Sequence, residues 1–353
     1  MSDLKPDGED ILVSEAEAND LTYFAFVKPK PVSVAVAQPK GKGRSRRRKG
    51  SRPKPVEAAP VAAVPVLLAG RYRLERLLGA GGMGTVYRAR DLLHEQFGDP
   101  DPYIALKVLS EEFAESPDAG LVLYSEFALT RRLCHPNIVR LHSFEVDAQC
   151  QCAFITMELM RGLTLDKLLC EHPSGLPWKA LQEVVVPLLD ALAYSHGRGV
   201  LHGDLKPSNV MLSEEGVRLF DFGLGQAEAG VLPGLPHLSR TRFNAWTLGY
   251  AAPELLEGGA LSAAADLYAV ACVIFELATG KHPFRRLPST QARDQRLDRT
   301  LQAPKHLPRH CWPVLRSALA FNVQERSATL DALVAAMRGE SPWWSRWWSR
   351  CRA

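Results

Sequence analysis

Three polar side chains with complementary chemistry occur within one octet of the chain. The octet HGDLKPSN, His202–Asn209, contains Asp204, Lys206 and Asn209, and its proline predicts a rigid loop. A further acid, Asp221, opens the run DFG directly after the strand-like stretch GVRLF. Carboxylate and amide oxygens are ligands that magnesium accepts, and a carboxylate can also take the proton of a hydroxyl group. The two stretches therefore predict a site that holds a metal ion and activates a hydroxyl.

A glycine-rich hairpin is predicted well upstream of this octet. Alternating apolar residues in RYRLERLLGAGGMGTVYRARD, residues 71–91, predict two strands whose connecting tip contains Gly79, Gly81, Gly82 and Gly84. Glycine lets backbone amides approach phosphate groups closely. Similar glycine patterns occur in dinucleotide-binding folds, but those folds require a helix directly after the glycines. Here the strand pattern continues, so a hairpin that covers phosphates is the favoured interpretation.

A lysine occupies the middle of the next apolar strand, YIALKVL, residues 103–109. Lys107 is costly to bury there unless it has an anionic partner. The candidate partner is Glu126, which falls in a predicted helix over residues 120–133. The alternative is that Lys107 lies on an edge strand and Glu126 on the surface of its helix. The glycine hairpin before them and the motif HPNIV after them favour an ion pair.

Taken in order, these motifs resemble those of the eukaryotic-like serine/threonine protein kinases of bacteria. The likeness rests on GAGGMGTVY, Lys107, Glu126, HPNIV, HGDLKPSN and DFG, which occur in the family's order and with compatible spacing. It implies an α+β protein kinase fold of two lobes. The small lobe, over about residues 71–158, is rich in β-strands with one main helix, and the larger lobe, over about 162–338, is helical.

The resemblance also implies a role for each motif residue. Asp204 would accept the proton of a Ser or Thr hydroxyl in a protein substrate, including the chain itself, and Lys206 would neutralise charge on the transferred phosphoryl group. Asn209 and Asp221 would hold Mg²⁺, with Mn²⁺ as an alternative. Lys107 would act in catalysis by contacting the phosphates. The residues implied to form the ATP site are Leu78, Gly79, Ala80, Gly81, Gly82, Met83, Gly84, Val86, Lys107, Glu126, Met157, Glu158 and Met160.

The chain departs from the family pattern at Gly203, where most members carry Arg. In those kinases the Arg pairs with a phosphorylated activation loop and couples phosphorylation to the ordering of that loop. The corresponding loop spans residues 221–254, with Ser239 and Thr241 as candidate phosphorylation sites and Thr247 as an implied contact of the active site. Because glycine carries no charge, we predict that phosphorylation of Ser239 or Thr241 is not the main activating step.

The larger lobe is predicted mainly from apolar residues at helical spacing. They indicate helices over residues 165–172, 180–199, 263–279 and 311–337. The window 263–279 contains Asp266 and Glu276, which favours a buried helix over a membrane span. Arg326 resembles the family's buried partner of Glu254, a pair expected to be structural. A catalytically inactive scaffold with the same fold is the alternative, but the six key polar positions are all retained.

The net charge of +4 is unevenly distributed along the 353 residues. Residues 1–70 are predicted to be a flexible tail, acidic at first, with nine Lys/Arg and no acid between residues 40 and 54. That basic run is either a solvated tail or a contact for anionic partners: nucleic acid, anionic lipid or the acidic segment of the same tail. The amino terminus lacks an apolar signal and the seven cysteines form no framework, so a cytoplasmic protein is expected.

The last fifteen residues, 339–353, form a second segment of unusual composition. The sequence SPWWSRWWSRCRA contains four tryptophans and three arginines. If this segment is helical, Trp343, Trp344, Trp347 and Trp348 share one face, as in an anchor at a membrane surface. The alternative is a helix that packs against its own lobe or another protein. Peripheral membrane association is therefore one of two expectations for this end of the chain.

Overall fold

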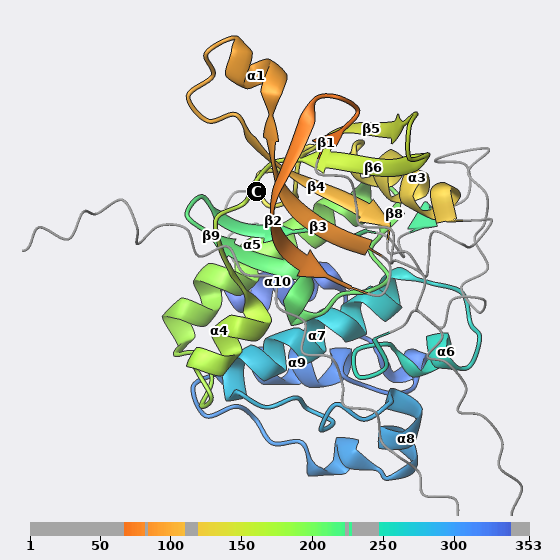
Figure 1. Ribbon diagram of the computed structural model, residues 1–353. Coiled ribbons are helices and arrows are strands. Elements are labelled where there is room, and N and C mark those ends of the chain that lie inside the picture. The colour runs from red at the N-terminus through yellow and green to blue at the C-terminus, as the bar shows by residue number, and fades with distance from the viewer. Residues whose placement is uncertain (1–66, 82–83, 110–118, 223–225, 228–246, 340–353) are drawn as a thin grey trace, which may run out of the picture.

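The computed structural model describes residues 67–81, 84–109, 119–222, 226–227 and 247–339, which form a β-rich lobe and a helical lobe (Figure 1). This is the α+β, two-lobed arrangement that the motifs predicted. Several predicted features lie outside the described residues: the acidic and basic segments of the tail, Gly82, Met83, Ser239, Thr241 and the four tryptophans of the last segment.

Six antiparallel strands form the sheet of the small lobe, in the order β1-β2-β3-β4-β6-β5. Their bounds are β1 (Leu67–Leu68), β2 (Tyr72–Ala80), β3 (Gly84–Asp91), β4 (Tyr103–Leu109), β5 (Leu141–Asp147) and β6 (Cys152–Met157). The described residues before position 71, the predicted start of the domain, include strand β1 of this sheet. Leu68 is fully buried and the Ala69 N–H donates to Asp147 Oδ2 at 2.6 Å.

Two helices accompany this sheet. The main one, α3 (Ala119–Thr130), corresponds to the helix predicted over residues 120–133. The short helix α1 (Leu92–Gln96) was not predicted and lies between β3 and β4. Asp91 begins it by accepting a hydrogen bond from Leu93 N–H at 3.0 Å, and its carboxylate also binds Arg71 at 2.6 Å. A single side chain therefore joins α1 to the start of the sheet.

The helical lobe contains the longer elements of the chain. Its α-helices are α4 (Leu165–Glu171), α5 (Trp178–Gly197), α6 (Pro253–Leu256), α7 (Ala263–Thr279), α8 (Ser289–Asp294), α9 (Cys311–Ala318) and α10 (Leu330–Arg338). The 3₁₀ helices are η1 (Pro207–Asn209), η3 (Leu297–Thr300) and η4 (Val323–Glu325), and the short strands are β7 (Gly162–Thr164), β8 (Val200–Leu201), β9 (Val210–Ser213), β10 (Gly216–Leu219) and β11 (Gln226–Ala227).

The helices predicted over 165–172, 180–199 and 263–279 are present as α4, α5 and α7. The prediction of continuous helix over 311–337 was wrong, because α9 and α10 are separated by an irregular segment that contains η4. This polar segment carries Arg326, whose guanidinium binds Glu254 Oε1 at 2.7 Å and the Ala320 carbonyl at 3.1–3.2 Å. The chain leaves helical geometry here to place a buried ion pair, and the predicted pairing of Arg326 with Glu254 is confirmed.

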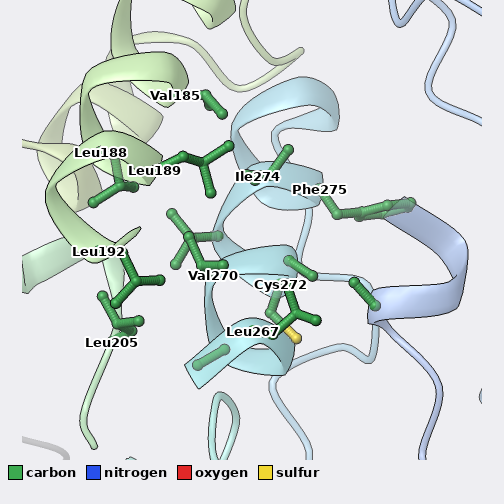
Figure 2. Close-up of a cluster of buried hydrophobic side chains, with 14 of the residues drawn as sticks. Val185, Leu188, Leu189, Leu192, Leu205, Leu267, Val270, Cys272, Ile274 and Phe275 are labelled. Atoms are coloured by element: carbon green, nitrogen blue, oxygen red, sulfur yellow. The ribbon is translucent and has the colours of Figure 1, made fainter. Parts of the chain in front are cut away.

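The core of the large lobe is centred on α7. Every residue of α7 from Ala265 to Ala278 is buried, so the helix is surrounded by protein on all sides. Figure 2 shows α5 and α7 side by side with Leu205, from the loop that carries Asp204, in the same apolar cluster. The octet with the catalytic candidates therefore rests directly on the core. Among the described residues, no helix has the length and apolar character required to span a bilayer.

Candidate active site

The predicted ion pair between Lys107 and Glu126 is present and buried. Lys107 Nζ lies 2.7 Å from both carboxylate oxygens of Glu126, and the two residues are 7% and 6% exposed. Nζ also donates to Asp221 Oδ1 at 2.9 Å, a second partner that was not predicted. Burial alone would lower the pKa of Lys107, but the charges of Asp221 and Glu126 outweigh it and hold the pKa above its usual value. The ammonium group therefore stays charged between two carboxylates.

Asp221 is held in an uncommon backbone conformation at the end of β10. Its φ of +66° is left-handed, a region that aspartate tolerates better than most residues. The next side chain, Phe222, is fully buried and its ring centroid lies 4.6 Å from that of His202. Burial acts to raise the pKa of Asp221, but Lys107 and Lys206 lower it to about 2. An ionised carboxylate is thus fixed beside the buried lysine.

The polar side chains of the HGDLKPSN octet contact one another directly. Lys206 Nζ lies 2.5 Å from Asp204 Oδ2 and 2.9 Å from Thr247 Oγ1. Asn209 Nδ2 donates to the Asp204 carbonyl at 2.9 Å. Asp204 Oδ1 makes no hydrogen bond with any other described residue and is left to accept a proton. The implied contact of Thr247 with the active site is confirmed.

The buried carboxylate of Asp266, on α7, holds the His202–Asn209 loop in place, a role that the sequence did not reveal. Asp266 Oδ2 accepts from the His202 N–H and from His196 Nε2, and Oδ1 accepts from the Gly203 N–H, each at 2.8 Å. Burial acts to raise the pKa of Asp266, but these hydrogen bonds and the charge of His196 hold it below its usual value. The sequence feature that could have revealed this role is the presence of an acid inside the apolar window 263–279. Since Gly203 has φ of +80°, glycine also suits the backbone that Asp266 fixes.

His202 connects the anchored loop to Asp221. Its Nδ1 accepts from the Asp204 N–H at 3.2 Å, which leaves Nε2 as the donor to the Phe220 carbonyl at 3.1 Å. Burial lowers the pKa of His202, so the neutral ring that this pattern requires is favoured. The two nitrogens of one imidazole therefore help to position the candidate proton acceptor, Asp204, and the candidate metal ligand, Asp221.

The donor set fits a divalent cation bound together with phosphate. Asn209 uses its amide nitrogen internally, so its amide oxygen remains available as a ligand, and Asp221 has one carboxylate oxygen beyond the one on Lys107. Within the described part of the chain, no group of three His, Cys, Asp or Glu side chains could hold a metal by itself. Magnesium is commonly held by one or two protein oxygens, with phosphates and water completing its shell. Asn209 and Asp221 meet that requirement.

A buried apolar cluster includes residues of β4, the strand that carries Lys107. The predicted contacts Leu78, Met157 and Met160 belong to one buried cluster, against which the half-buried Val86 packs. Ala105 and Met211, which were not predicted, belong to the same cluster. Ala105 could have been found because it precedes Lys107 by two positions on β4 and therefore shares its face of the sheet. These side chains suit a flat, apolar ring such as a purine base.

The backbone around this cluster is only partly available to a ligand. The Glu158 N–H donates to the Arg140 carbonyl at 3.0 Å, so the Glu158 carbonyl is the group left to face a base. The Gly81 N–H donates to the Gly84 carbonyl at 2.8 Å and closes the hairpin tip after Gly79 and Ala80. At Gly84 a Cβ would lie 2.5 Å from the Val108 carbonyl oxygen, so close packing between β3 and β4 also requires this glycine.

Comparisons with known proteins agree with this geometry. Residues 72–337 match the family described as protein kinase domain. The chain is 34% identical over 265 residues to serine/threonine-protein kinase PkaA of Streptomyces coelicolor. This match covers 72% of this chain and 47% of PkaA. It is 32% identical over 272 residues to serine/threonine-protein kinase PknE of Mycobacterium bovis, covering 76% and 45%. The chain therefore matches less than half the length of these two curated relatives.

Among solved structures, the kinase domain of Mycobacterium tuberculosis PknI is similar to this chain with a TM-score of 0.57 and 27% sequence identity. That match covers 80% of this chain and 100% of the solved domain. The small β-rich lobe and the larger helical lobe are thus those of a known fold.

Proposed function

Because this chain belongs to the protein kinase domain family, we propose that it transfers the γ-phosphoryl group of ATP to Ser and Thr hydroxyls of proteins, its own chain included. The observation that carries this proposal is the simultaneous contact of Lys107 Nζ with Glu126 and Asp221. It brings a phosphate-binding cation and a metal-binding acid together from three separate elements. Asp204, Lys206 and Asn209 complete the set on the adjoining loop.

In the proposed reaction the oxygen of the substrate hydroxyl forms a bond to the γ-phosphorus while the bond from that phosphorus to the β,γ-bridging oxygen breaks. Asp204 orients the hydroxyl and takes its proton, and ADP is the leaving group. Lys206, already bound to Asp204, neutralises charge on the transferred group. A divalent cation, for which we propose Mg²⁺ with Mn²⁺ as the alternative, would shield the phosphates and be held by Asn209 and Asp221.

The nucleotide is proposed to bind between the hairpin of the small lobe and Met211 of the large lobe. The base would pack against the cluster that contains Leu78, Ala105 and Met211, and the carbonyl of Glu158 is free to accept its amino group. Lys107 would contact the α- and β-phosphates. Support for these assignments is the single buried cluster that holds Leu78, Ala105 and Met211, together with the contacts of Lys107 with Glu126 and Asp221.

We further propose that the protein works in the cytoplasm and that its two ends, outside the described residues, direct it to partners. The support is compositional: residues 40–54 suit an anionic partner, and Trp343, Trp344, Trp347 and Trp348 suit a membrane surface or a protein contact. Cosedimentation of the full chain with phosphatidylserine vesicles, compared with a variant carrying Ala at the four tryptophans, distinguishes these uses. Equal sedimentation would exclude the membrane contact.

The proposed activity is tested by incubating the purified full chain with labelled ATP and Mg²⁺ or Mn²⁺, followed by mapping of the phosphorylated residues. We expect phosphate on Ser or Thr of the chain itself and of a generic basic protein. Asp204→Ala and Lys107→Met should abolish transfer, while Lys179→Met, a change at an exposed lysine of α5, should not. Wild-type rates in the Asp204→Ala and Lys107→Met variants would contradict the roles assigned to both residues.

Complete absence of transfer by the wild-type chain would favour the scaffold interpretation instead. Binding of a fluorescent ATP analogue separates the remaining cases. A chain that binds nucleotide without transfer would retain the pocket but lack the chemistry, and a chain that binds none would contradict the pocket assignment as well.

A further inference from the structure

A strongly basic surface lies on the large lobe, apart from the site described above. Residues 281–299 contain six cations against two acids, Asp294 and Asp298. All six cationic residues are exposed: Lys281, Arg285, Arg286, Arg293, Arg296 and Arg299. We call this region the basic surface. The formal charge of the whole chain is only +4, so this concentration of cations is a local property and requires a local explanation.

The basic surface adjoins the segment that follows Thr247. Arg286 Nη2 donates to Glu276 Oε1 at 2.8 Å, and the other oxygen of Glu276 accepts from the Tyr250 hydroxyl. A Cβ on Gly249 would lie 3.3 Å from Arg286 Cα, so the two backbones are in close contact. Thr247 in turn accepts from Lys206, the partner of Asp204. The cations therefore begin a few residues from the reacting groups.

Two further contacts fix the surface to that segment. Ser289 Oγ donates to the Ala251 carbonyl at 2.6 Å. Arg293 binds Glu257 at 2.5 Å and so links α8 to the residue directly after α6. In Figure 1 α8 lies directly below α6, at the same side of the large lobe. A protein substrate whose Ser or Thr reaches Asp204 would place its neighbouring residues along this side.

The surface is held in a strained conformation. Arg285, Arg286 and Arg296 all have left-handed backbones, with φ between 55° and 59°, where arginine is uncommon. His282 supports the first two, since its Nδ1 accepts from the N–H groups of Phe284 at 3.1 Å and Arg286 at 3.0 Å. Strained backbone is retained where the surrounding structure over-determines it, and it is concentrated at sites of ligand contact.

Four of the six cations are available to a partner. Within the described ranges, Lys281, Arg285, Arg296 and Arg299 form no ion pair, unlike Arg286 and Arg293. Exposed cations without an ion-pair partner, carried on one stretch of the chain, are suited to carboxylates in the residues of a bound peptide. We propose that the basic surface binds acidic residues flanking the target Ser or Thr of a protein substrate. This inference rests on the proposed kinase function and adds a substrate class to it.

The test compares two synthetic peptides that contain the same Ser, flanked by Glu residues in one and by Gln in the other. The full chain, a variant with Arg285→Glu and Arg296→Glu, and a control with Lys179→Glu and Arg316→Glu are assayed for kcat/KM. The control changes two exposed cations elsewhere on the large lobe. We expect wild type and control to favour the Glu peptide ~10-fold, and this preference to disappear in the variant and to weaken at high salt.

Each other outcome has a defined meaning. Equal kcat/KM for both peptides in the wild type overturns the inference and leaves the kinase function intact. If neither peptide is phosphorylated, the kinase function fails, and fluorescence anisotropy with the labelled Glu peptide then tests whether the basic surface binds acidic residues. Binding by the wild type that is lost in the variant supports the inference, and no binding by the wild type overturns it.

Two different occupants would also overturn the substrate assignment. If phosphatidylserine vesicles bind the wild type but not the variant, and the peptides show no preference, the surface binds lipid. If the variant instead phosphorylates the Gln peptide faster than the wild type does, the acidic residues 1–20 of the chain itself cover the surface.

Discussion

Asp266 Oδ1 accepts a hydrogen bond from the backbone N–H of Gly203 at 2.8 Å, so a carboxylate on the central buried helix fixes the loop that carries the proposed proton acceptor. We expect Asp266→Asn to lower kcat about 100-fold, because a small displacement of a catalytic group has an effect of that order. KM for ATP should change little, since Asp266 touches no part of the nucleotide pocket. Asp190→Asn, at an exposed ion pair with Arg338, is the control.

The Lys107–Glu126 pair predicts separate effects on stability and activity. Lys107→Met leaves Glu126 buried without its cation, which should lower the free energy of unfolding by about 3–5 kcal/mol. Adding Glu126→Gln should restore much of that stability but none of the activity. Thermal midpoints and kinase assays on the two variants give both quantities, and a double variant that regains activity would contradict the role of Lys107.

Thr247 is predicted to matter through Lys206. Thr247→Ala removes the hydroxyl that accepts from Lys206 Nζ at 2.9 Å, and we expect kcat to fall ~10-fold because the lysine that balances phosphoryl charge loses one of its two supports. Thr247→Ser keeps the hydroxyl and should retain most of the activity. Equal losses in the two variants would show that the methyl group, not the hydroxyl, is important.

Substitution of Ser239 and Thr241 by Ala is expected to leave kcat within about threefold of the wild type. These residues lie outside the described ranges, so the prediction rests on Gly203, which offers no guanidinium to a phosphate group. The measurement is the initial rate of the double variant beside that of the phosphatase-treated wild type. Loss of catalysis in the double variant would contradict it.

The Glu254–Arg326 pair should contribute to stability far more than a neighbouring exposed pair. The Arg326 side chain is fully buried, so Glu254→Gln would leave its charge unbalanced and should lower the free energy of unfolding by about 3 kcal/mol. Glu257→Gln, which breaks an exposed pair at the residue directly after helix α6, should leave the thermal midpoint nearly unchanged. Similar shifts in the two variants would contradict this distinction.

His282 predicts a pH dependence of stability. Burial lowers its pKa to about 4 from an ordinary value near 6.5, so the unfolded chain binds more protons between these two pH values. The folded state is therefore favoured above pH 6.5 and loses stability as the pH falls toward 4, by about 3 kcal/mol in total. In His282→Asn, thermal midpoints at pH 7, 5 and 4 should differ less than in the wild type.

One ion pair could be predicted from the sequence because a charge interrupts an apolar pattern. Lys107 in a buried strand required a partner, and the following helix offered Glu126. The second partner, Asp221, is 114 residues from Lys107, and no periodicity links residues so far apart. The contacts of Asp266 were missed for a related reason. An acid in an apolar helix correctly favoured a buried helix over a membrane span, but it did not reveal the hydrogen bonds to the loop that contains His202 and Gly203.

Local geometry was harder to predict than chemistry. The helix α1 depends on Asp91, which caps its first turn and also binds Arg71. Neither contact can be recognised from the spacing of apolar residues. The break between α9 and α10 likewise follows from a tertiary requirement, the burial of Arg326 against Glu254, which overrides the helical pattern on either side. In the sequence, the basic surface appears only as five arginines and a lysine spread over residues 281–299. In the structure, His282 stabilises the turn that contains Arg285 and Arg286 by accepting hydrogen bonds from the Phe284 and Arg286 N–H groups.

The shared position of Lys107 has a thermodynamic consequence. Its single ammonium group is held by Glu126 of α3 and by Asp221, which follows β10, so the placement of α3 and the occupancy of Asp221 are linked equilibria. Such linkage is reciprocal, with one coupling free energy acting in both directions. A cation that draws Asp221 away from Lys107 must strengthen the ion pair between Lys107 and Glu126 of α3. Conversely, a partner that displaces α3 must weaken the affinity for that cation by the same factor.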